Sequence, residues 1–567
     1  MARPEKIRLG EILVEQALLT AEQLTNALKE QRRSGNKLGR VLVDSGFVTA
    51  NQISKAIARQ MKLPFIDLKN FNAAPEALNK LSEAQARRFR VLILEDRGDS
   101  YLVGMADPTD LFAYDEITRI LNRQIQLAVV AESSVLQIID RTYRRTEEIS
   151  SLVQELGQEL GEATIDFAQL SLGANLEEAP VVKLLQTIFE DAVQVKASDI
   201  HIEPQENKLQ IRFRMDGELH LQTETNSKVA TALVLRLKLM SGLDISEKRL
   251  PQDGRFAIKV RQQSVDVRIS SMPTQYGESV VMRLLIQATG GFSLDKLGMP
   301  PMMLQRFRKL IHRPSGLVIV TGPTGSGKTT TLYAALSELN NVSNKIITVE
   351  DPVEYRLPGI NQVQVNEKID LSFSRVLRSA LRQDPDIVLV GEMRDQETAQ
   401  IGLRAAMTGH LVLSTLHTND AISSPVRLLD MGVPRYMMAM SLLAVVAQRL
   451  IRVICESCPQ TYNPKPAEHF WLKLELGAAV HDHTYARGEG CTYCNGTGYQ
   501  GRMGVYELLE MDTALVDAAN DEDTSQFIKL AREQMTHKTM RKYAVDLVVA
   551  KRTTIAEAMR ISNQFEV

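Results

Sequence analysis

The pattern of hydrophobic and polar positions changes along the chain and predicts several domains. Between residues 296 and 450, short apolar runs such as 317–320 and 387–390 alternate with helical stretches. Runs of this kind predict the buried parallel strands of an α/β core. Residues 209–215 and 265–269 instead alternate apolar and polar side chains, which predicts half-exposed antiparallel strands. We therefore expect a multidomain α/β protein.

The first 64 residues carry an internal repeat whose two copies lie 29 residues apart. In each copy, a short apolar helix is followed by a turn and by a capping-box sequence that starts a second, amphipathic helix. Thr20-Ala-Glu-Gln23 and Thr49-Ala-Asn-Gln52 are the two capping boxes. Periodicity alone favours a helical packing module without a ligand. The matched pairs are Arg8 and Lys37, Leu9 and Leu38, Gly10 and Gly39, Leu24 and Ile53, Leu28 and Ile57, and Gln31 and Gln60.

Two regions separate the repeat from the alternating strands. The pattern of the first predicts a small α/β module with strands at 91–94, 102–105 and 124–130 and without a catalytic signature. The second is acidic and poor in aromatic side chains, which predicts a helix and a linker. The expected boundaries are 1–64 for the repeat, 65–145 for the small module, 146–178 for the linker, 179–295 for the alternating strands, and 296–567 for the α/β core with a cysteine-bearing insertion at about 450–505 and a helical C-terminus.

Composition excludes several classes of function. Hydrophobic residues make up 44% of the 567 residues and charged residues 24%, an ordinary balance for a globular protein. The formal net charge of −2 gives no support for nucleic acid as a partner. The longest apolar run, residues 437–447, is too short to span a bilayer, and the N-terminus lacks the apolar core of a signal peptide. We expect a cytosolic protein without a transmembrane segment, which reaches a membrane only through partners.

A glycine-rich loop lies between the apolar run 317–320 and a helical stretch that starts at Thr330. It matches the phosphate loop G-x-x-x-x-G-K-[ST] in the strand, turn and helix context that this loop requires. Glycines allow successive backbone N–H groups to face phosphate oxygens, and the helix N-terminus adds positive charge. Lys328 can reach the β- and γ-phosphates, and the Thr329 hydroxyl can bind Mg²⁺. The expected nucleotide ligands are Gly322, Pro323, Thr324, Gly325, Ser326, Gly327, Lys328, Thr329 and Thr330.

Carboxylates end two of the strands that follow. One strand leads into Glu350, Asp351 and Glu354, and another ends at Gly391 beside Glu392. Because parallel sheets bind ligands at the carboxyl ends of their strands, we expect these carboxylates to converge near the phosphate loop. There they can hold Mg²⁺ or orient the attacking water. A glycine stands where a Walker B strand usually ends in aspartate, which leaves the direct metal ligand open.

Basic side chains form two further groups. His410 and His417 flank an apolar strand, and beside a nucleotide they can sense the γ-phosphate or signal to a neighbouring subunit. Each histidine taken alone favours a structural role. Arg255, Arg268 and Arg283 belong to the region of alternating strands, which predicts that arginines share one face and can meet a triphosphate. For any single arginine, a salt bridge within the sheet is the simpler interpretation.

All four cysteines lie between positions 455 and 494. They form two C-x-x-C pairs, Cys455 with Cys458 and Cys491 with Cys494, separated by 32 residues. Two such pairs suit a tetrahedral Zn²⁺ ion. A redox pair is the less favoured alternative, since the four cysteines are clustered and no others exist. A closed site of this kind is structural and ties an insertion together.

The order of these motifs resembles that of the secretion-ATPase superfamily, the type II secretion and type IV pilus motors (GspE/PilB). The resemblance runs from about residue 180 to the C-terminus. It implies a RecA-like P-loop motor domain, a preceding PAS-like α/β domain that supplies arginines, and a homohexamer that binds ATP between these domains. The implied roles are phosphate and Mg²⁺ binding for Lys328 and Thr329, catalytic base for Glu354, Walker B glutamate for Glu392, histidine box for His410 and His417, and nucleotide contact for Arg268, Arg283 and Arg255.

The duplicated helices resemble the N-terminal cyclic-di-GMP-binding domain of MSHA pilus ATPases of the MshE type. The pattern R-L-G-x-x-L followed by L-x-x-x-L-x-x-Q, given twice, carries the resemblance. It implies that arginine pairs with phosphate or stacks on guanine, that the glycines allow close approach, and that the glutamines bond polar edges. Lys37 replaces the arginine in the second copy, so the two copies need not contact the ligand equally. The implied ligand residues are Arg8, Leu9, Gly10, Leu24, Leu28, Gln31, Lys37, Leu38, Gly39, Ile53, Ile57 and Gln60.

Together these features predict a cytoplasmic bacterial ATPase, docked at the inner membrane through platform proteins, that drives pilin assembly and responds to cyclic-di-GMP. The resemblance assigns the cysteine clip to extension and secretion motors, which favours assembly over retraction. Two alternatives stay open. One is a type II secretion ATPase whose N-terminal domain only docks a platform protein, and the other is a nucleotide-binding scaffold with little turnover.

Overall fold

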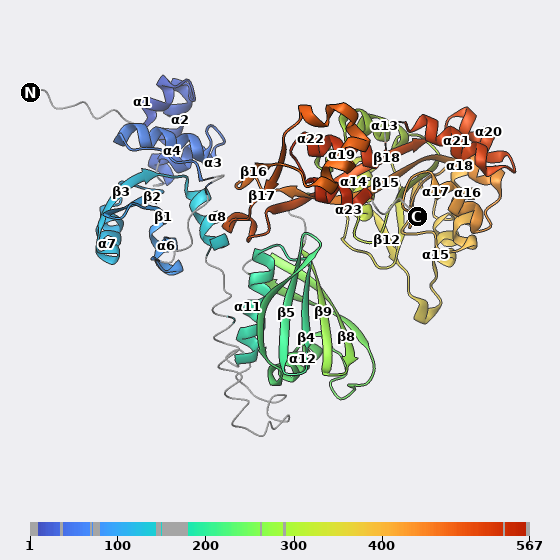
Figure 1. Cartoon of the computed structure of the whole chain (residues 1–567), viewed down its shortest axis with the longest axis horizontal. Helices are drawn as coiled ribbons and strands as arrows, with labels where there is room; N and C mark the ends of the chain where they lie inside the picture. Colours follow the sequence, from blue (N-terminus) through green and yellow to red (C-terminus); the bar gives the residue numbers. More distant parts are fainter. Residues whose placement is uncertain are drawn as a thin grey trace, which may run out of the picture.

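The structure is a computed structural model. It describes residues 9–34, 38–68, 71, 77, 80–142, 149, 180–260, 263–286, 291–536 and 539–562. Figure 1 shows the N-terminal modules on one side of the molecule, a middle domain below, and a large C-terminal domain on the other side. The expected class, a multidomain α/β protein, is confirmed.

The N-terminal repeat forms four helices that share one core. Each copy contributes a short helix and a longer one, as the repeat predicts. A β-carbon on Gly10 would lie 2.7 Å from Leu24 Cδ1, and one on Gly39 would lie 3.0 Å from Ile53 Cγ2. Equivalent glycines of the two copies therefore allow each short helix to pack closely on the following long one. The helices are α1 (Leu9–Glu15), α2 (Ala21–Ser34), α3 (Leu38–Asp44) and α4 (Ala50–Met61).

The small module that follows is a three-stranded sheet covered by helices. Its strand order is β1-β2-β3, with β1 antiparallel and β3 parallel to β2. The three expected strands are confirmed, whereas the expected linker lies almost wholly outside the described residues. The elements are α6 (Glu83–Phe89), β1 (Val91–Asp96), β2 (Ser100–Met105), α7 (Leu111–Leu121), β3 (Gln124–Val129) and α8 (Glu132–Thr142).

The middle domain is a six-stranded antiparallel sheet with the order β6-β5-β4-β9-β8-β7. Apolar side chains of the sheet and of two helices form its core, so the helices cover one face and leave the other for polar side chains. The alternation expected for half-exposed strands is confirmed in the burial of β5 and β8. The elements are α11 (Pro180–Gln194), β4 (Asp199–Pro204), β5 (Lys208–Met215), β6 (Glu218–Asn226), α12 (Lys228–Ser241), β7 (Gln252–Val260), β8 (Gln263–Thr274) and β9 (Gly277–Ile286).

The C-terminal domain is built on a seven-stranded sheet with the order β12-β11-β13-β14-β10-β15-β18. The strands from β12 to β15 run parallel, and β18 is antiparallel to β15. Two hydrophobic clusters, one on each face, bury the sheet beneath helices. The strands are β10 (Gly316–Thr321), β11 (Ile346–Glu350), β12 (Asn361–Gln364), β13 (Ile387–Val390), β14 (Leu411–Leu416), β15 (Leu442–Ile454) and β18 (Tyr499–Glu510).

Helices of the C-terminal domain cover the sheet and extend beyond it. A separate two-stranded hairpin belongs to the cysteine-bearing insertion. The α-helices are α13 (Pro301–Ile311), α14 (Lys328–Leu339), α15 (Phe373–Ala380), α16 (Gln396–Met407), α17 (Ser423–Asp430), α18 (Arg435–Ser441), α19 (Pro466–Leu476), α20 (Thr513–Asn520), α21 (Thr524–Gln534), α22 (Met540–Val549) and α23 (Ile555–Ser562). The hairpin strands are β16 (Pro459–Tyr462) and β17 (Tyr485–Gly488), and the 3₁₀ turns are η2 (Leu294–Lys296), η3 (Glu367–Ile369), η4 (Gly477–Asp482) and η5 (Thr492–Cys494).

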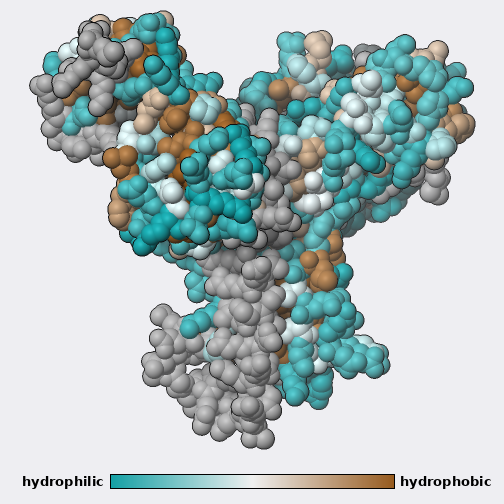
Figure 2. Space-filling model, turned by 60° about the vertical axis from the view of Figure 1, so that its left-hand side comes forward, coloured by the Kyte–Doolittle hydropathy of each residue, from teal (hydrophilic) through white to brown (hydrophobic). Residues whose placement is uncertain are grey.

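The surface is mostly polar where Figure 2 shows it, and hydrophobic side chains form small separate patches. None of the helices in the described part of the chain combines the length and the apolar character that a membrane crossing needs.

Candidate ATP site and metal centre

The phosphate loop connects the carboxyl end of β10 to the N-terminus of α14. Gly322, Gly325 and Gly327 have φ angles of 144°, 80° and 88°, which only glycine adopts readily. Helix α14 begins at Lys328, so the backbone N–H groups of its first turn face the loop. The strand, turn and helix expected from the sequence are therefore confirmed. This geometry suits an anion at the helix N-terminus.

Lys328 folds back over the loop. Its Nζ donates hydrogen bonds to the carbonyl oxygens of Gly322, at 2.8 Å, and Pro323, at 3.1 Å. Burial lowers the pKa of Lys328 to about 8, while Glu392 acts in the opposite direction and Arg449 lowers it further. Phosphate oxygens would offer the ammonium group stronger, charge-assisted partners than these two carbonyl groups do.

Nucleotide binding is expected to depend on pH through Lys328. A bound triphosphate stabilises the ammonium form and raises its pKa above the value of about 8 in the free protein. Binding above about pH 8 should therefore take up a proton, and the affinity should fall as the pH rises further, by up to about tenfold per pH unit. Calorimetry with a non-hydrolysable ATP analogue, in buffers of different ionisation enthalpy at pH 8.5, measures this uptake. Equal heats in all buffers would contradict the prediction.

Glu392 and His417 lie together beside the loop. Glu392 follows the short strand β13, and His417 follows β14, so both stand at the carboxyl edge of the sheet. His417 Nε2 lies 3.6 Å from Glu392 Oε2, and Arg394 pairs with the other carboxylate oxygen. Burial, and then the charge of Lys328, lower the pKa of His417. This group can therefore present a carboxylate and a largely neutral imidazole to phosphates or to a metal ion.

Glu350 and Glu354 have different environments. Glu350 is buried at the end of β11 and accepts hydrogen bonds from Tyr333 and Thr348, each at 2.5 Å. The expectation that Glu350 converges on the phosphates is wrong, because its side chain ties β11 to α14 inside the core. Glu354 lies beyond the strand and is only half-buried, with its Oε2 at 2.7 Å from Arg268 Nη2.

Arg268 joins the middle domain to the C-terminal domain. Besides its ion pair with Glu354, its Nη2 donates to the carbonyl oxygen of Val353 at 3.2 Å. A pocket of about 440 Å³ lies beside this contact, between the arginine-bearing sheet and Pro352, and Arg255 lines it as well. Three arginines and two aspartates, Asp199 and Asp253, line the pocket, so it keeps a small excess of positive charge that suits a phosphate group.

Four arginines of the middle domain and Asp199 form one row across five strands. The register pairs Arg214 with Asp199, Asp199 with Arg283, Arg283 with Arg268, and Arg268 with Arg255. The expected common face is therefore confirmed. Arg283 Nε lies 3.0 Å from Asp199 Oδ1, so for this arginine the simpler interpretation, a salt bridge within the sheet, describes the structure. Arg255 is exposed at the edge of the row.

His410 lies away from the phosphate loop within one chain. It precedes β14, whereas His417 follows it, and the parallel register with β10 places the loop at the His417 end. A strand of six residues spans about 20 Å, so the two histidines stand at opposite edges of the sheet. His410 Nδ1 instead lies 3.0 Å from the carbonyl oxygen of Ala405. Only His417 of this pair is brought to the candidate site.

Two polar residues of β15 belong to the site although the sequence motifs did not include them. Gln448 is buried beneath the phosphate loop, and Arg449 is buried beside the loop that follows β14. Arg449 Nη2 donates to Asn419 Oδ1 at 2.9 Å, two residues beyond His417. The available signal was a polar pair directly after the apolar run 442–447 of the same strand, where each buried polar side chain needs a partner.

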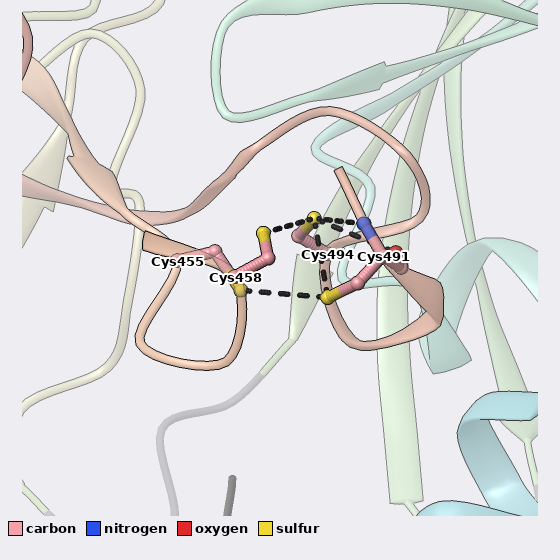
Figure 3. Close-up of side chains that lie close together, drawn as sticks. All are labelled: Cys455, Cys458, Cys491 and Cys494. Atoms are coloured by element: carbon pink, nitrogen blue, oxygen red, sulfur yellow. Dashed lines mark hydrogen bonds between the residues drawn. The ribbon is translucent and has the colours of Figure 1, made fainter. Parts of the chain in front are cut away.

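The four cysteines converge as the expected metal centre requires (Figure 3). Their sulfur atoms all lie within 4.8 Å of one another, and neighbouring pairs are 3.7 to 3.9 Å apart. Four sulfurs at about 2.3 Å from a tetrahedral Zn²⁺ ion would be about 3.8 Å apart. The backbone N–H groups of Cys491 and Gly498 donate to Cys494 Sγ, each at 3.2 Å, which suits a thiolate ligand. The donor set therefore fits zinc.

Loss of one cysteine ligand is expected to release the metal. Cys455→Ser should lower the zinc content from about one equivalent per chain to well below half, because a hydroxyl replaces a thiolate ligand. The midpoint of thermal unfolding should fall by roughly 5 °C, as expected when a clip that orders a hairpin is lost. Ser457→Ala, between the same cysteines, serves as the control and should retain zinc. Wild-type protein prepared with zinc but containing none would contradict the assignment.

The candidate ligand residues of the N-terminal repeat are only partly described. Arg8 and Lys37 lie outside the described residues. Gly10 is buried, and its missing β-carbon makes room for Leu24, so close helix packing already accounts for this glycine. The other residues proposed for the ligand are placed on the four helices, with Leu28 and Gln60 exposed and Leu9, Gln31, Leu38, Gly39 and Ile57 half-buried.

Comparison with known proteins identifies two families. A model described as Type II/IV secretion system protein matches residues 174–560, and one described as MshEN domain matches residues 61–149. The chain is 41% identical over 512 residues to the type IV pilus assembly ATPase PilB of Myxococcus xanthus, covering 88% of this chain and 89% of that protein. It is also 41% identical over 504 residues to the type II secretion system protein E of Aeromonas hydrophila, covering 86% and 98%.

A solved structure shares the fold. The ATPase DotB of Legionella pneumophila matches with a TM-score of 0.50 and 21% identity, covering 67% of this chain and 96% of that chain. The MshEN match lies on the small α/β module, beside the duplicated helices. The family match spans more than half of the chain, and the relatives are ATPases of secretion and pilus machines. With its phosphate loop in place, the chain thus belongs to the type II/IV secretion system protein family and is one of its P-loop ATPases.

Proposed function

We propose that this ATPase is a homohexameric motor that powers assembly of an MSHA-like type IV pilus, and that cyclic-di-GMP binds its N-terminal repeat. The observation that carries the regulatory part is the duplicated helical module itself. Its two copies form the same pair of helices, and the MshEN match begins at Met61, the last residue of α4, and continues over the adjacent small module. The twofold sequence repeat suits a ligand that itself has two equivalent halves.

The ATP site is proposed to work across two domains. Lys328 and the loop N–H groups hold the phosphates, Thr329 and Glu392 hold Mg²⁺, and His417 lies against Glu392. The metal supplies charge neutralisation on the phosphates when it is bound. In this structure Arg268 forms an ion pair with the carboxylate of Glu354. A triphosphate bound in the pocket would compete with Glu354 for Arg268. Once Arg268 binds phosphate, the Glu354 carboxylate would be free to orient and deprotonate the attacking water.

Three further residues are proposed to act only in the assembled ring or with nucleotide bound. Arg283 would exchange Asp199 for phosphate, and Arg255 would join it at the open end of the arginine row. His410 lies at the far edge of the sheet, so any role in signalling would involve a neighbouring subunit. We place the ring in the bacterial cytoplasm, docked on inner-membrane platform proteins of the pilus machine.

A type II secretion ATPase is the second candidate. The relative from Aeromonas hydrophila has the same identity to this chain as the pilus ATPase, and the match covers more of its length. In that case the N-terminal domain would only dock a platform protein. Deletion of the gene in its host separates the two functions, since loss of surface pili supports the first and loss of a secreted protein supports the second.

Calorimetry with full-length protein tests the regulatory proposal. Wild-type protein should bind cyclic-di-GMP, and Arg8→Ala should weaken binding about tenfold or more, because it removes a charge-assisted contact with phosphate. Arg59→Ala, an exposed residue on α4 of the same module, is the matched control and should bind normally. Absence of heat with the wild type would return the module to a docking role, with ATP hydrolysis unaffected.

A further inference from the structure

We propose that Gln448 is a positioning residue of the ATP site, which holds the phosphate loop in its anion-binding shape. Gln448 lies on β15, the strand next to β10, and is 1% exposed. It cannot touch the nucleotide from beneath the loop, so it acts through the loop backbone. The inference rests on the family's ATPase activity and is independent of which machine the motor drives.

Both polar atoms of the Gln448 side-chain amide form hydrogen bonds. Its Nε2 donates to the carbonyl oxygen of Ser326 at 2.6 Å, inside the phosphate loop. Its Oε1 accepts from the Thr331 hydroxyl at 2.8 Å, in the first turn of α14. One side chain therefore ties the loop and the start of its helix to the same strand. A carboxamide is the group that offers a donor and an acceptor together at this length.

The donated bond fixes the direction of a peptide group. In a planar trans peptide, the carbonyl oxygen of one residue and the N–H of the next point in opposite directions. Because Gln448 holds the Ser326 carbonyl beneath the loop, the N–H of Gly327 faces the opposite side, where phosphate binds. Rotation of this peptide would direct a carbonyl oxygen at the phosphate and repel it. Gln448 thereby excludes an alternative loop conformation that glycine would otherwise permit.

The glycines of the loop fit closely around this residue. A β-carbon on Gly327 would lie 2.9 Å from Gln448 Nε2, and one on Gly322 would lie 2.4 Å from the Gln448 backbone oxygen. Two of the loop glycines are thus required by the approach of β15 as well as by backbone conformation. The adjacent Arg449 points to the other face of the strand and holds Asn419. Consecutive residues of β15 therefore support the phosphate loop and the loop that carries His417.

Binding of a non-hydrolysable ATP analogue tests the proposal. Gln448→Met keeps a similar volume, removes both hydrogen bonds and leaves a buried carbonyl oxygen unpaired, so the affinity should fall about tenfold or more. Ser441→Ala is the matched control, since it removes another buried side-chain hydrogen bond of this domain, the one from Ser441 Oγ to the Met437 carbonyl oxygen at 2.6 Å. The control should bind the analogue normally. Wild-type affinity in Gln448→Met would overturn the proposal.

Gln448→Glu supplies a readout that a merely structural residue would not give. The ionised carboxylate can still accept from Thr331 but repels the Ser326 carbonyl oxygen, whereas the protonated form can donate to it. Its affinity relative to wild type should therefore recover as the pH falls from 8 to 6, and that of Gln448→Met should not. If Gln448→Met fails to fold, a pH-independent ratio for Gln448→Glu would by itself overturn the proposal.

Discussion

Replacing Lys328 by alanine is expected to abolish ATP turnover, with kcat/KM falling about a thousandfold or more. Lys328 is the first residue of α14, and its ammonium group already lies over the phosphate loop, bonded to two loop carbonyl oxygens. In the transition state, negative charge spreads over the transferred phosphoryl oxygens, so a fixed positive charge there stabilises it selectively. Steady-state phosphate release by the full-length protein measures the effect.

Lys309→Ala is the matched control for this substitution. Lys309 is an exposed lysine on α13 of the same domain, and its replacement should leave phosphate release within about twofold of wild type. Both variants should unfold at temperatures close to that of wild type. Hydrolysis by Lys328→Ala at the wild-type rate would show that turnover in the preparation does not come from this phosphate loop.

Replacing Arg268 by alanine is expected to lower kcat about a thousandfold while the protein stays folded. Arg268 contacts the C-terminal domain through Glu354 and the Val353 carbonyl oxygen. An arginine that reaches a phosphoryl group from a separate domain is typically worth about 10³ to 10⁵ in rate. The substitution also removes one of several contacts between the two domains, and others remain, such as the hydrogen bond from the Gly501 N–H to Asp216 Oδ2 at 2.9 Å.

Arg249→Ala separates this effect from a general loss of charge. Arg249 lies in the same domain, pairs with Glu247 and is 87% exposed, so its replacement should leave turnover near the wild-type value. Arg268→Lys keeps the charge but loses the forked geometry, and we expect it to recover only part of the rate. Equal turnover in Arg268→Ala and Arg249→Ala would remove the middle domain from the catalytic site.

Local patterns predicted the parts of the site that depend on a single segment. The phosphate loop is one such segment, since its glycines, Lys328 and Thr329 define a strand, a turn and a helix without help from elsewhere. The common face of Arg268 and Arg283 also followed from alternation, because successive strand residues point to opposite sides. The cysteine cluster followed from two short pairs whose spacing is typical of zinc.

Features that depend on contacts with a helix or strand elsewhere in the sequence were not predictable. Glu350 ends a strand like the other carboxylates, but its side chain accepts a hydrogen bond from Tyr333 of α14 inside the core. The spacing of residues along the sequence does not show this contact. The two histidines appeared equivalent until the length and direction of β14 placed them at opposite edges. Gln448 was missed because its partners lie more than 100 residues away in sequence, at separations of 122 and 117.

For the N-terminal repeat, too, the local pattern was predictable and the spatial contacts were not. The repeat predicted four helices, and the structure contains them. Whether Gly10 serves a ligand or only helix packing could not be derived from the pattern, since glycine suits both a close helix contact and a close approach to a ligand. The spatial neighbours of a glycine, which a sequence does not show, decide between these roles.

Phosphate release by Glu354→Gln tests the central claim most directly, namely that Glu354 activates the water that attacks the nucleotide held by the phosphate loop. The substitution keeps the shape of the side chain and removes its ability to accept a proton. We predict that this variant binds the ATP analogue about as tightly as wild type and releases phosphate about a hundred- to ten-thousandfold more slowly, as expected for loss of a general base. Phosphate release at the wild-type rate would contradict the account.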